Sequence, residues 1–546
     1  MRQTSLFLPI LTLLFSALSF ANGEMSCERA FQYNRKIDLD QIDAQIQSER
    51  ATRTPERDRF LKRVQSEGKL AYQDRSFIGD YANIDQMTAI EVPRAQILDQ
   101  GRAGTCWMQA LKNRLREKGT FSIAYWQYFD KYFRSSRSLY EAIDTLEANT
   151  DYAYDNVDVR EALTPKVEDG GWSQWGDYLI ETVGAVPTSV MPETPSSVDT
   201  EFVNEEIANA QTVLFERLKK KANEFRALKA KGNFTPAQRK ELDQIAQAGL
   251  EWIRTDYLIP HFGDAPSPKS QKVEFLVAAK TQTTNGNLKN RDLKRLKLTP
   301  LEIKNQMIQY VPGQMIVLAH NPNRPLNKKY KVEKSGTSFG VKGKRGDGSL
   351  SQLNIEPMQM AKLALASLTD DLETAAQSGN RYAQAELDKA IYDPQTRKRI
   401  RNGQGLWFAA QIGKETLITD TIGALDTRVT LRDPSDSKKF PPALPQNESM
   451  YYNTSGANHA MYLSGAVTTF EDYQHLGMPK ADVPFFFMVD NSWSEKVGFK
   501  GRLFMNLNWF VKNVYEVTVD RKYLPNDLLL LIEGKPTKIK KGGSFY

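Results

Sequence analysis

Hydrophobic positions recur at helical spacing through much of the first half of the chain. In Cys106–Arg116 they stand among good helix formers with no Pro or Gly, which predicts a helix that begins at its first residue. Phe121–Phe133 carries an aromatic stripe, which indicates a helix packed against a core. Residues 200–257 are rich in Lys, Glu, Ala and Leu and predict long helices. They are interrupted before Thr235, which caps a new helix that has Pro at its first position.

The second half of the chain changes to a strand-like pattern. His459–Val467 and Phe485–Asp490 are short, nearly continuous apolar runs, as expected for buried strands. From Leu406 onward the residues alternate as in strands, which favours a small antiparallel barrel. Helices followed by strands therefore predict an α+β fold.

Composition and charge are those of an ordinary globular protein. The chain has 546 residues, which exceeds a single core, so two subdomains with a large insertion are expected. The net charge of +7 is mild over this length. We find no nucleic-acid recognition motif, no Gly-rich phosphate loop and no Cys/His spacing for zinc. Nucleic acid, a metal and an organic cofactor are therefore not expected as partners.

Residues 1–21 have the pattern of an export signal. The start is positively charged, residues 6–20 are almost wholly apolar, and small residues precede a cut after Ala21. An apolar run of about fifteen residues is short for a bilayer span. We expect a periplasmic or secreted protein with no membrane span once the signal is removed; an uncleaved anchor is the alternative.

The segment Gln100–Trp107 constrains the chemistry most. It places a Gln six positions before Cys106, which a Trp follows at once. A helix N-terminus lowers the pKa of a cysteine and so favours the thiolate, the form that attacks a carbonyl carbon. Thr105 or Gly104 is the expected cap of that helix. The side-chain amide of Gln100, with the backbone N–H of Cys106, can donate to the oxyanion that the attack creates.

His459 is the best candidate for a base among the four histidines. The others stand in loop-like or polar contexts: His261, His320 and His475. His459 begins a predicted buried strand, and rigid strands place catalytic groups accurately. Asn491 follows the next strand, and its amide oxygen can accept the imidazole N–H, while Trp493 shields that hydrogen bond from water.

Each candidate also has a structural explanation. A lone cysteine is usually a small buried hydrophobe, and a lone histidine near apolar residues is more often a hydrogen-bonded core residue than a base. The joint pattern has no common structural explanation, because it combines Gln100 and Cys106 at this spacing with His459 on a strand and Asn491 before Ser-Trp. The combination predicts a cysteine nucleophile with a histidine base.

These residues resemble the papain-like cysteine peptidases, and within them the branch of bleomycin hydrolase and aminopeptidase C. The resemblance covers most of the chain after the signal. Further similar stretches are Asp169–Trp175, Gly184–Thr194 and Tyr515–Pro525, with weaker ones at Pro322–Tyr330 and Gly405–Phe408. The first of them is similar to the glycine pair whose backbone binds substrate in papain-like clefts, here Gly170 and Gly171.

The resemblance implies a papain-like two-subdomain α+β fold, with a helical half, a small antiparallel β-barrel half and a large helical insertion. It implies peptide hydrolysis through an acyl-enzyme, in which Cys106 attacks, His459 transfers the proton, Asn491 orients the imidazole and Gln100 stabilises the oxyanion. The residues expected to contact substrate are Gly170, Gly171, Trp107, Trp493 and Tyr546. Expected partners are peptide substrates and further copies of the chain, with a hexamer implied by this branch.

The segments expected from these assignments cover the whole chain. They are a signal peptide (1–21), a helical leader (22–90), the helical catalytic subdomain (91–199), an inserted helical arm (200–300), a connecting and partly helical segment (301–404), the β-barrel catalytic subdomain (405–525) and a C-terminal arm (526–546). The leader either wraps the core or acts as a propeptide.

Several residues depart from the family pattern. Ala103 stands where papain itself has a disulfide cysteine, as expected for this branch, and Ser494 replaces the glycine that usually follows Asn-Ser-Trp. Residues 369–402 form a longer, charged helical segment than the resemblance leads us to expect. A disulfide between Cys27 and Cys106 would remove the nucleophile, so we expect Cys27 to be free or paired between chains.

The resemblance implies that the C-terminal arm decides which peptides are cleaved. In the resembled branch its terminal carboxylate faces the free amine of the substrate, which makes the enzyme an aminopeptidase. Tyr546 would supply that carboxylate here, although Phe545 is bulky and the neighbouring Lys540 and Lys541 repel an incoming amine. An aminopeptidase is therefore expected. The alternatives are an endopeptidase with an open cleft and a catalytically idle peptide-binding or assembly protein of the same fold.

Overall fold

A computed structural model describes most of the chain. The described residues are 39–67, 78–82, 84, 88–92, 97–149, 151–153, 156–228, 234–278, 293–332, 350–413, 415–419, 421–429, 456–468 and 485–535. The expected signal peptide, Cys27, His475 and Tyr546 lie outside them. The chain forms two compact units, residues 1–72 with 432–440, and residues 73–431 with 441–546. In the first unit the described elements are two charged helices, α3 (Leu39–Thr52) and α4 (Pro55–Glu67).

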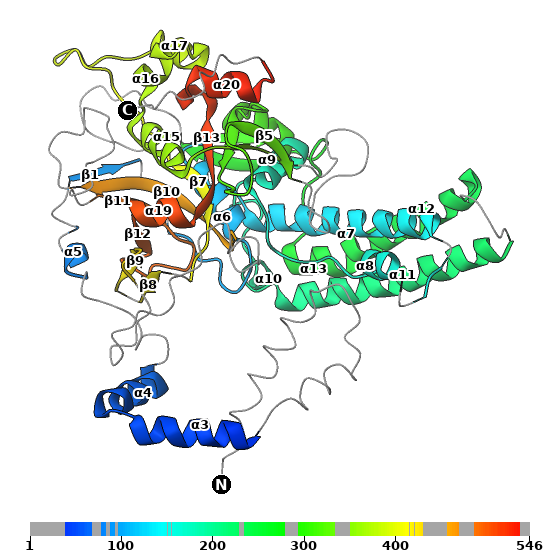
Figure 1. Cartoon of the computed structure of the whole chain (residues 1–546). Helices are drawn as coiled ribbons and strands as arrows, with labels where there is room; N and C mark the ends of the chain where they lie inside the picture. The colour runs from blue at the N-terminus through cyan, green and yellow to red at the C-terminus, as the bar shows by residue number, and fades with distance from the viewer. Residues whose placement is uncertain are drawn as a thin grey trace. The chain divides into compact units, whose positions relative to one another are not determined.

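The second unit contains the helices and strands of the predicted catalytic fold (Figure 1). Its helices are α5 (Gly79–Ala82), α6 (Cys106–Arg114), α7 (Ile123–Ala148), α8 (Val157–Ala162), α9 (Ser173–Val183), α10 (Pro195–Val198), α11 (Glu201–Leu228), α12 (Pro236–Ile253), α13 (Ile259–Phe262), α14 (Pro300–Ile303), α15 (Pro357–Thr369), α16 (Leu372–Gln377), α17 (Arg381–Leu387), α19 (Leu507–Asn513) and α20 (Asn526–Ile532). Single turns of other helix types are η4 (Arg254–Leu258), η5 (Lys304–Ile308) and η6 (Arg521–Tyr523).

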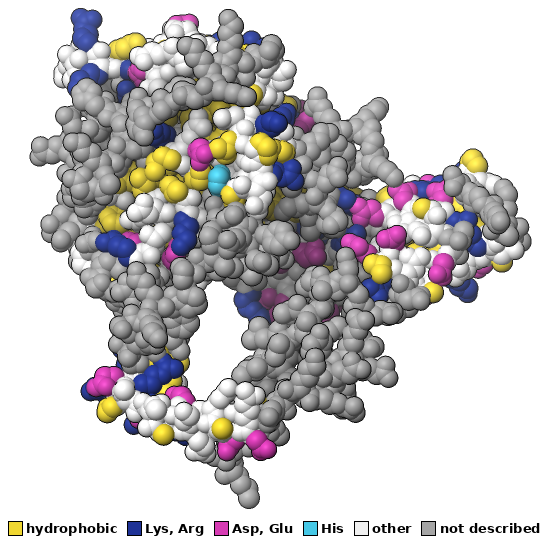
Figure 2. Space-filling model, viewed as in Figure 1, with side chains coloured by type: hydrophobic (Ala, Val, Ile, Leu, Met, Phe, Trp, Pro, Cys, Tyr) yellow, Lys and Arg dark blue, Asp and Glu magenta, His cyan; other side chains and the backbone are white. Residues whose placement is uncertain are grey.

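The helical part is built around α7. Ser122 caps this helix by accepting a hydrogen bond from the Tyr125 N–H at 3.0 Å. Helices α7, α11 and α12 contact one another and extend away from the sheet (Figure 1). The start of α12 is as predicted, because Thr235 forms a capping box with Gln238 and Pro236 occupies the first turn. On the face shown in Figure 2 this helical arm carries interspersed acidic and basic side chains with few apolar ones, which is typical of a solvated surface.

The strands form one large sheet and one hairpin. They are β1 (Thr88–Glu91), β4 (Met315–Ala319), β5 (Lys328–Val332), β6 (Leu350–Asn354), β7 (Leu406–Ala410), β8 (Thr416–Ile418), β9 (Gly423–Leu425), β10 (His459–Thr468), β11 (Phe485–Asp490), β12 (Arg502–Asn506) and β13 (Val514–Asp520) in the sheet, and β2 (Val273–Ala278) with β3 (Leu293–Leu298) in the hairpin. The sheet has the order β5-β6-β4-β13-β7-β10-β11-β12-β9-β8, and β1 also pairs with β10. The β4–β6 and β12–β9 pairs are parallel and the others antiparallel.

The α+β prediction is confirmed, and the sheet is larger than the sequence pattern indicated. Strands β1, β4, β5 and β6 come from before Leu406, where the alternation was expected to begin. Strand pairing joins residues far apart in the chain, such as Glu516 with Ala319, and local periodicity does not register such partners. The start of the expected C-terminal arm also differs, because residues 526–532 form α20 with Leu528 and Leu529 buried.

Strand β7 divides the two main hydrophobic cores. Leu406, Phe408 and Ala410 face a core shared by the sheet, α15 and α19, whereas the intervening Trp407 and Ala409 face the core of the helical part. This alternation follows from the two-residue period of side chains along a strand. The central strands are therefore buried on both faces, and their ends meet the helical part at the predicted site.

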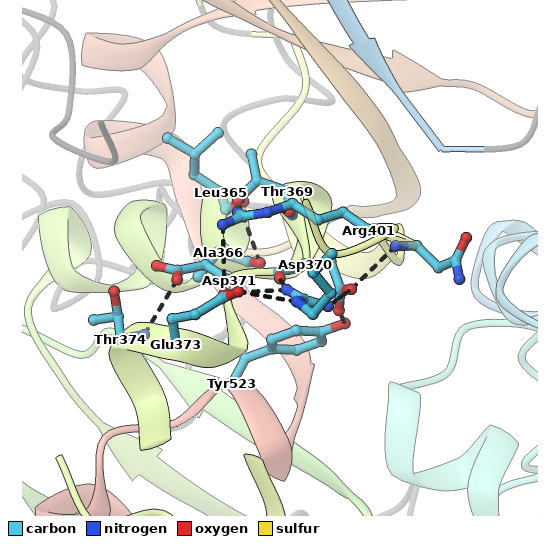
Figure 3. Close-up of polar contacts among 11 residues, drawn as sticks. Leu365, Ala366, Thr369, Asp370, Asp371, Glu373, Thr374, Arg401 and Tyr523 are labelled. Atoms are coloured by element: carbon cyan, nitrogen blue, oxygen red, sulfur yellow. Dashed lines mark hydrogen bonds and ion pairs between the residues drawn. The ribbon is translucent and has the colours of Figure 1, made fainter. Parts of the chain in front are cut away.

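The charged segment 369–402 is fixed by a buried ionic cluster (Figure 3). The Arg399 guanidinium donates to Asp370 Oδ2 at 2.5 Å and to Glu373 Oε1 at 2.9 Å, and Asp370 also accepts the Tyr523 hydroxyl at 2.8 Å. The side chains of Asp370 and Arg399 are each only 6% exposed, so this pair joins the two ends of the segment, and the Tyr523 hydrogen bond joins the segment to η6. Among the described residues, no helix is both long enough and apolar enough to cross a membrane.

Candidate active site

Cys106 is the first residue of α6, as the sequence predicted. Thr105 occupies the N-cap position, but its side chain makes no capping hydrogen bond. Cys106 as a residue is half-buried, and its Sγ lies 3.5 Å from the backbone nitrogen of Ala460, the residue after His459. The start of α6 and the start of β10 therefore meet at the sulfur.

His459 is held by backbone and side-chain contacts at the start of β10. It pairs with Ala410 of β7, and the preceding Asn458 forms two hydrogen bonds with the backbone of Ile412, at 2.7 and 2.8 Å. Trp493 stacks on the imidazole with ring centroids 4.6 Å apart and covers it as expected. These contacts fix the ring with little freedom to rotate.

The hydrogen bonds of Asn491 identify which imidazole nitrogen can act as a base. Asn491 Oδ1 lies 2.9 Å from His459 Nε2 and accepts the backbone N–H of Ser492, also at 2.9 Å. Because a backbone N–H can only donate, the atom facing it must be the amide oxygen. That oxygen cannot donate to the imidazole, so Nε2 carries the proton. Nδ1 of the neutral ring is then free to accept a proton from a thiol.

Gln100 joins the nucleophile loop to the Asn491 loop. Its Nε2 donates to Ala103 O at 2.8 Å, and its Oε1 accepts the Ser492 hydroxyl at 2.5 Å. The backbone supports the same junction, since Gln100 N donates to Ser492 O at 2.8 Å and Ser494 N donates to Leu98 O at 3.1 Å. The second Nε2 hydrogen is the one available to an oxyanion beside Cys106.

Burial favours the uncharged forms of both reacting groups. It raises the pKa of the Cys106 thiol above its ordinary value, and the nearby Asp169 carboxylate raises that pKa further. Backbone N–H groups, including that of Ala460, oppose this effect without overcoming it. Burial also lowers the pKa of His459 to about 4, although the Asn491 hydrogen bond acts in the other direction. This direction differs from the one expected for a cysteine at a helix N-terminus, and its largest cause is desolvation of the thiol.

Gly170 and Gly171 lie beside the nucleophile helix. A Cβ added at Gly171 would come within 2.4 Å of the Trp107 ring, so only glycine fits there, whereas a Cβ at Gly170 would meet nothing within 4 Å. Gly170 O accepts a hydrogen bond from Arg134 Nη2 at 2.6 Å. The glycine pair therefore lies between α6 and α7, with Gly170 facing open space.

Trp107 differs from its expected role as a substrate contact. Its side chain is fully buried and donates through Nε1 to Asp169 O at 2.8 Å. Its own carbonyl accepts the Trp407 indole N–H at 3.1 Å. A bulky ring at the first turn of α6 is pulled into the helical core, so Trp107 supports the glycine pair from beneath.

Ser494 and two of the other histidines lie at defined positions in the structure. Ser494 adopts φ +68°, the left-handed conformation that favours glycine, so a serine at this position carries a conformational cost. His261 contacts Ser196 and Glu206 away from this site, and His320 bonds Ile355 O. Within the described ranges, no group of three or more His, Cys, Asp or Glu side chains could hold a metal ion.

Sequence reasoning missed two supporting residues. Ser492 was read only as part of the Asn-Ser-Trp motif, yet its hydroxyl holds Gln100. Asp169 was read only as the residue before the glycine pair, yet its carboxylate accepts the Gly104 N–H at 3.2 Å. An Asp next to two glycines was the available signal for the second.

The comparisons with known proteins identify the family of the chain. A family model, the Peptidase C1-like family, matches residues 64–374 and 371–544. The chain belongs to this family. It is a cysteine-type peptidase of the branch that contains bleomycin hydrolase and aminopeptidase C.

The relatives of this C1-like peptidase align along most of its length. Aminopeptidase E of Lactobacillus helveticus is 24% identical over 479 residues, which cover 86% of this chain and 90% of that protein. Bleomycin hydrolase of Gallus gallus is 24% identical over 463 residues, which cover 82% and 85%. The crystal structure of PepW from Lactobacillus rhamnosis HN001 matches with a TM-score of 0.68 at 23% identity, covering 92% of this chain and 97% of that chain. This last likeness shows the papain-like fold.

Proposed function

We propose that this C1-like peptidase hydrolyses peptide bonds through an acyl-enzyme on Cys106, and that it acts at free N-termini. The observation that carries the proposal is the hydrogen bond between His459 Nε2 and Asn491 Oδ1, with the Cys106 thiol at the start of the same strand. It leaves Nδ1 as the proton acceptor. A histidine with a purely structural role has no need of both features found here. One imidazole nitrogen of His459 faces an oxygen that can only accept, and the strand that begins at His459 lies beside a thiol.

The reaction begins from the neutral thiol and imidazole. Sγ attacks the substrate carbonyl carbon, the thiol proton passes to His459 Nδ1, and the carbonyl oxygen becomes an oxyanion. As the C–N bond breaks, the imidazolium gives its proton to the leaving amine, and a thioester on Cys106 remains. Water, deprotonated by His459, attacks the thioester, releases the carboxylic acid and restores the thiol.

Gln100 and the backbone N–H of Cys106 serve the oxyanion in both steps. The Gln100 amide is buried and fixed at its oxygen by Ser492, so little reorganisation is needed when the negative charge develops. Asn491 holds the imidazole plane while its charge changes. Each group therefore acts more strongly on the transition state than on the bound substrate.

Action at free N-termini is supported by the relatives named aminopeptidase C and aminopeptidase E. As the resemblance implies, a terminal carboxylate at Tyr546 would pair with the amine of the substrate. An open cleft used by an endopeptidase is the second candidate, since Phe545 is bulky and Lys540 and Lys541 are positively charged. We further propose export directed by residues 1–21, and assembly into a homo-oligomer as in the resembled branch.

The test uses fluorogenic aminoacyl amides with free or acetylated N-termini. We expect hydrolysis of the free substrates, strong discrimination against the acetylated ones, and no turnover by Cys106→Ala. A truncation from Gly542 should narrow the discrimination. Equal cleavage of both substrate types would identify an endopeptidase, and absence of cleavage by the wild type would leave the idle peptide-binding protein. Sequencing the mature N-terminus and measuring mass by light scattering check export and assembly.

A further inference from the structure

The Asp169 carboxylate is the meeting point of four segments. Oδ1 accepts the Lys131 ammonium of α7 and the Asn204 amide at 3.1 Å. Oδ2 accepts the Thr200 hydroxyl and the backbone N–H of Gly104 at 3.2 Å. Each oxygen thus holds two donors, which leaves no capacity for a substrate group or for proton transfer.

The carboxylate is charged although it is largely buried. Burial alone would raise the pKa of Asp169, but the Lys131 ammonium and the hydrogen bonds from Thr200 and Asn204 hold that pKa below its ordinary value. The Lys131 side chain is 2% exposed and that of Asp169 14%. A buried ion pair of this kind contributes little net stability compared with apolar residues, but it defines one geometry sharply.

The geometry that it defines is that of the reacting cleft. On one side the carboxylate holds Gly104, two residues before Cys106. On the other side the chain continues directly into Gly170 and Gly171, whose backbone is expected to bind substrate. A misplacement of about 1 Å between a nucleophile and its substrate can cost about 10²-fold in rate. The position of Asp169 therefore matters for turnover even though it touches no reacting atom.

Two of the four donors belong to the start of the inserted helical arm. Thr200 directly precedes α11, and Asn204 lies in its first turn. Helix α11 contacts both α12 and α7, so the arm holds this end of the helix in place. The arm is thus joined, through one carboxylate, to Gly104 of the nucleophile loop and to the chain that leads into the glycine pair.

We propose that Asp169 is a positioning residue through which the inserted helical arm holds the Gly170–Gly171 wall in register with the nucleophile loop. The inference deepens the proposed function, since it assigns a role in aligning the peptide with Cys106. The inserted helical arm would then contribute to catalysis by holding the glycine pair in position.

The test compares two alkylating reagents on Cys106. Iodoacetamide needs only the thiol and the base, whereas a peptidyl chloromethyl ketone also needs the cleft wall to align it. We measure the ratio of their second-order rate constants, the alignment ratio, under conditions where each variant is fully folded by near-ultraviolet circular dichroism. Misalignment should lower this ratio at least about 10-fold in Asp169→Asn. The double variant Thr200→Val with Asn204→Leu should also lower it while leaving Lys131 paired.

Asp177→Asn is the matched control. It breaks the ion pair between Asp177 and Arg114, whose side chains are 15% and 8% exposed, so its burial is similar but it contacts neither Gly104 nor the glycine pair. We expect its alignment ratio to equal that of the wild type. If Asp169→Asn does not fold, the Thr200 and Asn204 double variant decides the question.

The outcomes separate this inference from the proposed function. An unchanged ratio in both the Asp169 and the arm variants, or an equal fall in Asp177→Asn, would overturn the positioning role. A wild type with no preference for the peptidyl reagent would overturn it too. A wild type that reacts preferentially with the peptidyl reagent but hydrolyses no peptide would defeat the proposed function alone, because the alkylation ratio does not depend on turnover.

Discussion

The loop that leads into Cys106 and the strands that position His459 and Asn491 are fixed by different kinds of interaction. The nucleophile side depends on buried charged side chains, with Lys131 paired to Asp169 and Arg134 paired to Asp130, all largely removed from solvent. These pairs hold backbone that belongs to no regular element.

The base side depends on backbone pairing. His459 and Asn491 lie at the ends of β10 and β11, whose ladder places Tyr462 opposite Asp490. Every residue of β11 is buried, and it packs mainly through Phe, Met and Val side chains. The ion pair between Asp490 and Arg502 joins residues that the β11–β12 ladder already places opposite each other.

The difference has a physical origin. A strand end is positioned by many hydrogen bonds and apolar contacts, so no single side chain decides its place. A loop lacks such a ladder, and a few charged groups with strict geometry take over that role. Loss of one charge should therefore disturb the nucleophile side more than loss of one apolar contact disturbs the base side.

Removing the base tests whether the two sides act as one site. His459→Ala should lower kcat by about 10²- to 10⁴-fold, because it removes the group proposed to take the thiol proton. His261→Ala is the control, since that imidazole is also partly buried and hydrogen-bonded but lies away from the thiol. Steady-state kinetics on an aminoacyl substrate measure both. Similar losses in the two variants would contradict the assignment of the base.

Breaking one buried charge pair should destabilise the protein more than altering the sheet core. Arg134→Met leaves Asp130 buried without its partner, and we expect the free energy of unfolding to fall by about 3–5 kcal/mol. Burial already raises the pKa of Asp130. Met461→Leu in β10, a swap of similar volume, should cost less than about 1.5 kcal/mol. Urea unfolding of both variants measures the difference; equal costs would remove the proposed contrast between the two sides.

The fold was predictable wherever the pattern was local. The helix from Cys106, the cap at Thr235 and the strand Phe485–Asp490 all followed from periodicity and from residue types at element ends. The strands at residues 315–354 were not recognised, and β4 among them pairs with β13, far along the chain. Pairing over such distances leaves no local signature.

The site was predictable as a set of residues but not as an environment. The sequence brought Gln100, Cys106, His459 and Asn491 together by type and spacing, and the structure places them at one junction. Desolvation was not readable from the sequence, and so the direction of the Cys106 pKa was not anticipated. The burial of Trp107 was missed for the same reason, since burial depends on tertiary packing.

Removing the side-chain amide of Gln100, the proposed oxyanion donor, should lower the rate of turnover far more than the free energy of unfolding. Gln100→Ala should lower kcat/KM by about 10²-fold, because a preorganised donor is lost from the transition state. Gln127→Ala is the control: its buried amide donates to Ser197 O at 3.0 Å, as Gln100 donates to Ala103 O, but it lies outside the site. It should lower stability and leave kcat/KM nearly unchanged. A near-normal rate in Gln100→Ala would exclude that residue from the mechanism.

The smallest expected effect is the change in the free energy of unfolding at acidic pH. It shows which side of the site, that of His459 or that of Asp169, loses stability first as the pH falls. His459 has a pKa of about 4 in the folded protein, because burial disfavours its charged form. In the unfolded chain its pKa is about 6.5, so between these values the unfolded chain binds a proton that the folded protein does not. Stability therefore falls as the pH is lowered, and we expect His459 to contribute a loss of about 2 kcal/mol between about pH 7 and about pH 4.5.

Comparison of the wild type with His459→Gln isolates that contribution. The variant should lose less unfolding free energy on acidification, by about 2 kcal/mol, because its side chain does not titrate. Asp169, on the nucleophile side, has a lowered pKa, so its stabilising charge is lost only at still lower pH, and acid should weaken the base side first. If the resting site instead holds a thiolate and an imidazolium, the pKa of His459 is raised. The wild type would then be no more sensitive to acid than the variant over this range, and denaturant unfolding at both pH values distinguishes the two cases.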